Sequence, residues 1–359
     1  MSNLPAPDAE DLDAILAYLR EQGATEQEID EALSLGAVGE LSLELSLRGP
    51  GVLVPFAEAA GRLGLAEDDA ARVWRALGFP DPASVATMLG PREVEVLQLV
   101  AHDALQFLGA DSMMQFARVL GSAMVLLADT IVDGFRVEYE VPQRDAGTPY
   151  ADIVRNYSEL AAALLPPFVA AMDAILRRHI VTAARSIWTI DDERSTVTRQ
   201  VTVGFVDLVG YTAASRAFTP RRLAEAIANF ETLVSELVSA AGGRVVKLIG
   251  DEAMFVVDDL SACDVALRLA DAAAADGGPG PVRIGLASGP TVTMAGDYYG
   301  EVVNLAARLV KVAEPGTVVV SASVRNSVAV TEALSFAPLD PLQLKGFDEP
   351  VVAFVLGQA

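Results

Sequence analysis

Apolar residues in the first half of the chain recur at helical spacing. Those between residues 12 and 19 keep a period of about 3.6 residues, and Gly23 is placed to end that helix. Thr25 and Glu28 have the spacing of a capping box for a second helix. Further helices are expected, between glycine and proline breaks, over residues 68–77, 91–108, 112–132, 150–164 and 167–188. The pattern predicts an all-α domain over residues 1–190, with a connector helix at about 167–192.

One segment of this domain fits two kinds of element. Leucines at positions 41, 43, 45 and 47 alternate with polar residues, which is the pattern of a strand. The segment nevertheless lies between helical stretches. Residues 41–47 therefore remain open between strand and helix.

The pattern changes after the polar stretch 191–195. Short apolar runs predict a hairpin around Gly250, a closing hairpin over 343–356, and strands over 200–206, 282–288 and 317–321. Helices are expected from Thr219, as N-cap, to Ala241, and over 260–275 and 300–312. This mixture predicts an α/β sandwich, so the whole chain is expected to be α+β.

Composition limits the possible partners and surroundings. At 359 residues and 52% hydrophobic content, the chain can form two domains with their own cores. The net charge of -23 argues against nucleic-acid binding, which needs a clustered basic face. Cys263 is the single cysteine, which excludes an intrachain disulfide and favours a reducing interior.

The start of the chain and its most apolar stretches bear on location. The first residues lack the basic and apolar regions of a signal peptide. The stretches 120–128 and 160–172 are shorter than a membrane span, and the second contains Pro166 and Pro167. We therefore expect a cytoplasmic protein without a transmembrane segment.

Two aspartates are the strongest candidates for chemistry. Asp207 ends an apolar run that is typical of a buried strand, and Asp251 follows Gly250 in the predicted hairpin. Carboxylates at adjacent strand ends can hold divalent ions, which neutralise a polyphosphate and activate an oxygen nucleophile. The pair predicts a metal site.

Further polar residues suit a nucleotide. Asn304 and Arg308 lie one helical turn apart, so one ligand can meet both. Arginine can donate a bidentate pair to a phosphate, and asparagine can orient a hydroxyl. Lys247 would lie roughly 13 Å from Asp251 along an extended strand, so these two residues are expected to serve different ends of a substrate or different sites.

Five ordered segments carry a resemblance to a known family. The segments FVDLVGYT, KLIGDEAMF, VRIGLASG, GDYYGEVVNLAARL and LKGF resemble the catalytic domain of class III nucleotide cyclases over residues 198–357. The resemblance implies a ferredoxin-like α/β sandwich and a homodimer with two equivalent sites between protomers. One protomer would supply Asp207 and Asp251 to bind two divalent ions per site, Mg2+ or Mn2+, and Arg283 to bind the triphosphate. Tyr211 and Ala287 depart from the Phe and His that are common in the family, and neither position is catalytic in this scheme.

By the same resemblance, the opposite protomer would complete the site. Arg308 would stabilise the transition state, Asn304 would align the ribose, and Lys345 would hold the terminal phosphates. Lys247 and Asp297 would contact the base. A lysine can donate to adenine N1 and an aspartate can accept from the N6 amine, whereas guanine has the reverse pattern, so ATP is the expected substrate.

Two other functions remain as alternatives. Residues 249–255 resemble the Gly-Gly-Asp-Glu-Phe turn of diguanylate cyclases, but Ile249 replaces the first glycine and two residues intervene before Phe255. The chain could instead be a nucleotide-binding regulatory module without turnover. Release of a cyclic nucleotide distinguishes an enzyme from such a module.

The first half resembles the helical regulatory segment of actinobacterial adenylyl cyclases, on the stretch 71–80 and the long helix that leads into the second half. That resemblance implies autoinhibition and a response to pH. The broad apolar faces, rich in methionine, suggest burial against a partner copy, with packing in the core of the domain itself as the alternative, and they allow a lipid ligand. His179 on the connector is a regulatory candidate, because histidine can change its charge between about pH 5 and 8.

Overall fold

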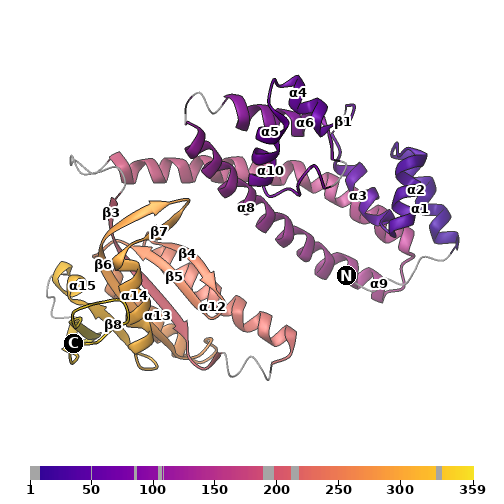
Figure 1. Cartoon of the computed structure of the whole chain (residues 1–359). Coiled ribbons are helices and arrows are strands. Elements are labelled where there is room, and N and C mark those ends of the chain that lie inside the picture. The colour runs from indigo at the N-terminus through magenta and orange to yellow at the C-terminus, as the bar shows by residue number, and fades with distance from the viewer. Residues whose placement is uncertain are drawn as a thin grey trace. The chain divides into compact units, whose positions relative to one another are not determined.

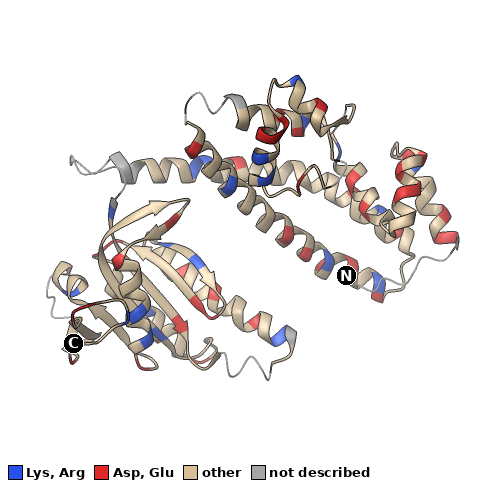
Figure 2. Ribbon diagram, in the orientation of Figure 1, with Lys and Arg blue, Asp and Glu red and all other residues tan. Residues whose placement is uncertain are grey.

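The chain forms two compact units in the computed structural model, Met1–Asp192 and Glu193–Ala359 (Figure 1). The structure describes residues 9–49, 51–84, 87–103, 107, 109–188, 198–211, 218–328 and 334–359. The end of the predicted connector, after Trp188, lies outside the described residues. Acidic side chains are present on helices of both units, in keeping with the net charge of -23 (Figure 2).

The N-terminal unit is almost entirely helical. Its only described strands, β1 (Val54–Pro55) and β2 (Met88–Leu89), form a short antiparallel pair. Two apolar cores hold the unit together, one around Trp74 and one around Leu19. The helices are α1 (Ala9–Glu21), α2 (Glu26–Leu35), α3 (Val38–Leu47), α4 (Phe56–Arg62), α5 (Glu67–Ala76), α6 (Pro91–Gln98), α8 (Ala110–Phe135), α9 (Val141–Asp145) and α10 (Tyr150–Trp188), with π-helical turns η1 (Leu99–Asp103) and η2 (Arg136–Glu140).

Local sequence explains how two of these helices begin and pack. The predicted capping box is present before α2, where the Thr25 hydroxyl accepts the Glu28 N–H and Glu28 accepts the Thr25 N–H. The segment left open between strand and helix is helix α3. Ser42 on α3 is fully buried and its hydroxyl lies 2.8 Å from that of Ser158 on α10. Leu41 and Leu45 are buried beside it, so tertiary packing decides the conformation against the alternating pattern.

Two predicted helix boundaries are wrong. The helices expected over 150–164 and 167–188 are one helix, α10, with Pro166 and Pro167 inside it. The prolines leave the carbonyls of Ala162 and Ala163 without donors, and because Ala162 is half-buried and Ala163 is exposed, water can reach these carbonyls. The helix expected over 91–108 ends as an α-helix at Gln98 and continues as the π-helical turn η1.

Two long helical stretches of the structure correct the expectation that the apolar segments are too short to span a membrane. Residues 110–145 and 150–184 form two stretches that are long and apolar enough to cross a membrane by length and composition. Only 11% and 0% of their most apolar windows are buried within the structure. The two stretches therefore present apolar surface that the described residues leave uncovered.

The C-terminal unit is a sandwich of one sheet with helices on both faces (Figure 1). The segment from β3 to β6 has the β-α-β-β-α-β order of a ferredoxin-like fold. The elements of the whole C-terminal unit are β3 (Thr198–Leu208), α12 (Pro220–Ala240), β4 (Arg244–Ile249), β5 (Glu252–Val257), α13 (Ala262–Ala274), β6 (Val282–Met294), β7 (Asp297–Tyr299), α14 (Glu301–Val312), β8 (Val318–Ser321), α15 (Ala322–Ser327), β9 (Leu334–Pro338) and β10 (Ala353–Gln358).

Strand order and alternation divide the core into two faces. The order is β4-β5-β3-β6-β8-β10-β9, with β7 paired to β6, and among the described strands β6 and β8 pair in parallel. Val206 and Phe255 face α12 and α13, whereas Val203, Phe205 and Met254 face α14. The α+β class and the sandwich are confirmed.

The predicted closing hairpin over 343–356 is wrong in its partner strand. Strand β10 pairs with β9 and β8, and residues 339–352 join β9 to β10. Within that connection, an isolated bridge joins Leu342 and Val351. Strand β9 was not predicted, although half-buried Leu334 and Phe336 alternate with exposed Ser335 and Ala337, because the run has only five residues and ends in Pro338.

Candidate active site

Asp207 stands at the end of the row of β3 side chains that lies on the α14 face of the sheet. It pairs across the sheet with Glu252 on β5 and with Arg283 on β6. Directly opposite residues of antiparallel strands project to the same face. The apolar row formed by Val203 and Phe205 therefore ends in a charged triplet of Asp207, Glu252 and Arg283.

Asp251 is brought beside this triplet by the β4–β5 turn. Gly250 takes a left-handed φ of 65° there, and the Leu208 N–H donates to the Asp251 carbonyl at 2.9 Å. This bond ties the end of β3 to the turn. A pocket of about 660 Å³ opens at this point, lined by Asp207, Leu208, Gly210, Ile249, Asp251, Glu252, Arg283 and Lys311.

Charge is concentrated in this pocket. Arg283 donates to Asp207 at 2.5 Å, and both side chains are partly buried. Burial raises the pKa of Asp207 above its ordinary value; Arg283 opposes this shift, and repulsion from Asp251 adds to it. Burial also raises the pKa of Glu252, which Lys311 opposes and both aspartates reinforce. Three carboxylates thus repel one another in one pocket.

The donor set fits a bound cation and an anionic ligand. Carboxylate oxygens are the groups that Mg2+ and Mn2+ prefer, and a cation would relieve the repulsion among them. Within the described residues, no group of three or more His, Cys, Asp or Glu side chains has the arrangement of a complete metal site. Oxygen atoms of a substrate or of water can supply further ligands. The Arg283 Nε atom is buried and has no hydrogen-bond acceptor among the described residues, so it can serve an anion.

Sequence reasoning missed two members of this pocket, Glu252 and Lys311. A signal existed for each of them. Glu252 is adjacent to Asp251, and Lys311 follows Arg308 by three residues on the same helix, which places both on one side of α14. The charge of Lys311 was not expected beside the aspartates because only the sheet–helix contact brings them together.

Lys247 and Asp297 form a second, separate cluster. Lys247 Nζ donates to Asp297 Oδ2 at 2.6 Å, with 38% and 25% of the side chains exposed. The Tyr298 N–H donates to Asp297 Oδ1 at 2.8 Å. Burial raises the pKa of Asp297, but the bonds from Lys247 and Tyr298 together hold it below its ordinary value. Asp297 is therefore an ionised acceptor in a fixed orientation.

Helix α14 carries the remaining candidates. Its N-cap is Gly300, and Asn304 and Arg308 follow on its partly exposed side. Arg308 Nε donates to the Lys345 carbonyl at 3.3 Å, so these two predicted residues are neighbours. Neither Asn304 nor Arg308 lines the pocket of Asp207. The candidate residues of one chain therefore form two separate sets, one around Asp207 and one that includes Lys247, Asp297 and the residues of α14, rather than one completed site.

Comparison with known proteins identifies the family. Residues 194–358 match the model described as the adenylate and guanylate cyclase catalytic domain. An uncharacterized protein of Mycobacterium tuberculosis is 36% identical over 353 residues, covering 95% of this chain and 89% of that protein. An adenylate cyclase of Streptomyces coelicolor is 30% identical over 309 residues, covering 84% of this chain and 80% of that protein. The chain belongs to the adenylate and guanylate cyclase family.

Two further matches complete the comparison. A pH-sensitive adenylate cyclase of Mycobacterium tuberculosis is 29% identical to this cyclase over 327 residues, covering 88% of this chain and 79% of that protein. The solved adenylyl cyclase CyaB from P. aeruginosa is 22% identical with a TM-score of 0.39, covering 46% of this chain and 97% of that chain. At that score the family assignment takes no support from the structural likeness.

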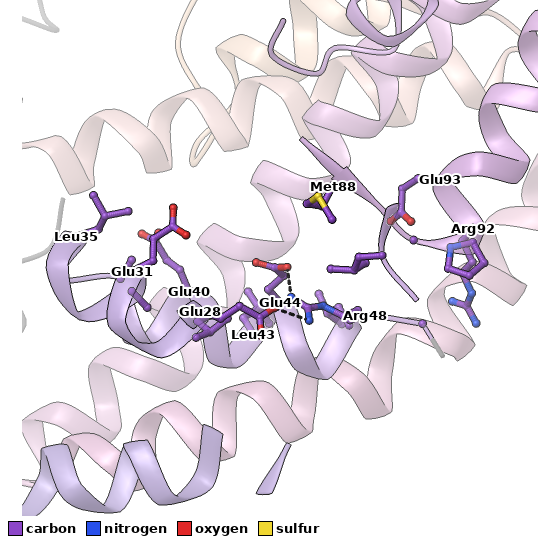
Figure 3. A pocket seen from close by; sticks show the side chains of 18 residues that line it. Glu28, Glu31, Leu35, Glu40, Leu43, Glu44, Arg48, Met88, Arg92 and Glu93 are labelled. Carbon is purple, nitrogen blue, oxygen red and sulfur yellow. Dashed lines mark hydrogen bonds and ion pairs between the residues drawn. The ribbon is translucent and has the colours of Figure 1, made fainter. Parts of the chain in front are cut away.

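The N-terminal unit of the cyclase has a pocket of its own. It measures about 710 Å³ and lies between α2, α3 and the β2–α6 segment (Figure 3). Arg48 crosses its centre, bonded to Glu28 at 2.8 Å and to Glu44 at 2.6 Å. Five glutamates and two arginines line it beside leucines. This lining is too polar for an acyl chain, so this pocket gives no support to the predicted lipid ligand, which stays a prediction.

His179 lies exposed on α10. Its neighbour Arg177 is paired with Asp173 at 2.8 Å on the same helix. The position leaves the imidazole open to solvent and to any partner that covers this face. A regulatory role for His179 stays a prediction.

Proposed function

We propose that this chain is an adenylate cyclase that converts ATP to 3′,5′-cyclic AMP and pyrophosphate at the interface of a homodimer. Relatives named adenylate cyclase support the activity. The observation that carries the proposal is the division of the site into two sets, a carboxylate pocket and a set that includes the Lys247–Asp297 pair. Two copies in opposite orientation would join one set from each protomer, twice.

The Lys247–Asp297 pair supports the choice of ATP. Lysine offers donors for adenine N1, and the ionised Asp297 offers an acceptor for the N6 amine. GTP presents a donor at N1 and an acceptor at O6, so each contact would place like partners together. The wrong base then leaves buried polar groups unpaired, at about 1–3 kcal/mol each.

Asp207 and Asp251 would hold the divalent cations. When bound, such ions neutralise the triphosphate and lower the pKa of the ribose 3′-hydroxyl. Arg283, with its unpaired Nε, would hold phosphate oxygens from the same side of the site. We propose that each site binds two ions and that these ions are Mg2+ or Mn2+.

The partner's residues would act on the reacting atoms. The 3′-oxygen forms a bond to the α-phosphorus, the bond from that phosphorus to the β-phosphate oxygen breaks, and the hydroxyl proton leaves to solvent. Asn304 would orient the ribose for in-line attack. Arg308 would donate to the charge that grows on the transferring phosphoryl group, and Lys345 would hold the leaving pyrophosphate.

Loss and recovery of activity test the shared site. We expect Asp207→Ala or Asp251→Ala to abolish cyclic AMP formation without unfolding the chain, because each removes a carboxylate from an open pocket. Arg308→Ala should also be inactive. Heterodimers of Asp207→Ala with Arg308→Ala contain one intact composite site and should recover activity. Inactivity of verified heterodimers would show that the two sets do not meet across a dimer.

The N-terminal unit is proposed to regulate this activity. The similarity to a pH-sensitive adenylate cyclase extends over 88% of the chain and so includes this unit. Its exposed apolar side chains, such as Leu126 at 68% and Leu176 at 60%, suit burial against a second copy.

The proposed location is the cytoplasm, because the proposed substrate, ATP, is available there. Comparing the full chain with residues 193–359 across pH tests the regulation; equal specific activity and equal pH profiles would refute it.

A further inference from the structure

Two side chains of β4 hold the tip of the β6–β7 hairpin. Lys247 bonds to Asp297 at 2.6 Å, and Arg244 Nη2 donates to the Gly296 carbonyl at 2.6 Å. Strands β4 and β7 share no backbone pairing, since β7 pairs with β6. The two side-chain bonds are therefore direct links between β4 and the segment that carries Asp297.

A β-bulge makes this double contact possible. Residues three apart on a regular strand project to opposite faces of a sheet. Here the pairing shifts between Val245 and Lys247, so that Arg244 lies opposite Val256 and Lys247 lies opposite Met254. Val256 and Met254 belong to the same core cluster on the α14 face. The bulge thus places Arg244 and Lys247 on one face, as bulges near active sites commonly do.

Arg244 also contacts the residue that orients Asp297. Its guanidinium lies 5.4 Å from the centre of the Tyr298 ring, which is 6% exposed. The Tyr298 N–H in turn fixes Asp297 Oδ1 at 2.8 Å. The turn before Asp297 needs such support, because Ala295 has a φ of 54°, which is unfavourable for a residue with a Cβ.

We propose that Arg244 is a positioning residue for nucleobase selection, which holds Asp297 at the distance and orientation that lets it act with Lys247. The inference rests on the proposed adenylate cyclase function. Arg244 fixes the turn through Gly296 and the start of β7 through Tyr298. Without it, Asp297 keeps its charge but loses its fixed place relative to Lys247.

Selectivity between ATP and GTP tests this role in the full-length protein. We expect Arg244→Ala to lower the ratio of kcat/KM for ATP to that for GTP roughly tenfold, mainly through a higher KM for ATP, because pairing with the base is part of substrate binding. Arg244→Lys should give an intermediate ratio, since lysine can reach a carbonyl but lacks the planar group that stacks on Tyr298.

A matched control and a double-mutant cycle separate positioning from stability. Arg325 lies 4.9 Å from the Phe354 ring centre in the same unit, so Arg325→Ala removes a comparable contact away from the site and should leave the ratio unchanged. In an Asp297→Ala background, Arg244→Ala should have no further effect on the ratio. An unchanged ratio in Arg244→Ala, or an equal effect in both backgrounds, overturns the inference.

A different measurement tests the proposed function itself. A wild-type chain that forms no cyclic AMP refutes the adenylate cyclase proposal. The role of Arg244 is then decided by calorimetric affinities for ATP and GTP in the same variants. Equal ATP preference in the wild type and in Arg244→Ala would refute it there.

Discussion

Gly285 allows α14 to lie directly on the sheet, and a single methyl group there should disrupt the site. A Cβ at Gly285 would lie 2.3 Å from the Val310 N atom and 2.6 Å from the Ala306 carbonyl. Both atoms belong to the backbone of α14, so no side chain can rotate away. The helix must recede by about 1 Å to restore van der Waals contact near 3.5 Å.

The size of the expected effect follows from what α14 carries. Overpacking of this kind costs about 1–3 kcal/mol of stability. A shift of about 1 Å in residues that orient the substrate can lower a rate by roughly 100-fold. Asn304 and Arg308 both lie on α14, so Gly285→Ala should lower kcat by about that factor while the protein remains folded.

Gly204 provides the matched comparison on the neighbouring strand. A Cβ there would lie 2.1 Å from the Phe255 ring, which packs on the opposite face with α12 and α13. Gly204→Ala should therefore lose similar stability but retain most of the activity per folded molecule. The assay pairs thermal unfolding with cyclic AMP formation below both transitions. Equal kcat values for the two variants would refute a special role for the seating of α14.

Two further predictions concern the N-terminal unit. Burial raises the pKa of Glu28, but bonds from Thr25 and Arg48 together hold it below its ordinary value. This carboxylate therefore stabilises the fold fully at pH values above its unfolded pKa of about 4.3, and the stabilisation is lost as pH falls through the folded pKa. Arg48→Ala should cost about 1–3 kcal/mol at neutral pH and move acid unfolding of this unit to higher pH, as followed by circular dichroism; an unchanged acid transition would contradict this. If His179 contributes to pH control, His179→Ala should shift the pH midpoint of cyclic AMP formation by the full chain, whereas an unchanged midpoint excludes that role.

Sequence patterns were sufficient for several elements that have one buried face. The capping box at Thr25 and the N-cap at Thr219 lie as predicted, and strand β3 contains the predicted strand 200–206 and extends two residues beyond it at each end. Periodicity failed where local signals and tertiary contacts conflict, as in the helix through Pro166 and the helical segment at Leu41. In each case the structure follows packing or solvent access rather than local propensity.

The candidate site shows the same limit at the level of single residues. Motif positions located Asp207, Asp251 and Arg283, and the structure brings these three together. The spacing of Lys311 from Arg308 was a sequence signal, but its place beside the aspartates depends on how closely α14 approaches the sheet. Arg244 could not be predicted beside Asp297 from the sequence, because regular strand alternation places Arg244 and Lys247 on opposite faces of the sheet. The bulge in β4 places them on the same face.

Helix α14 connects the two halves of the proposed site. Asn304 and Arg308 on its partly exposed side would serve the site completed by the partner, while Lys311 near its end lines the carboxylate pocket of its own protomer. A displacement of this helix therefore changes both sets at once. Gly285 fixes the position of the helix at the backbone of Ala306 and Val310, within the segment that carries these three residues. This arrangement is the physical reason to expect that Gly285→Ala reduces rate more than stability, and that Gly204→Ala does the reverse.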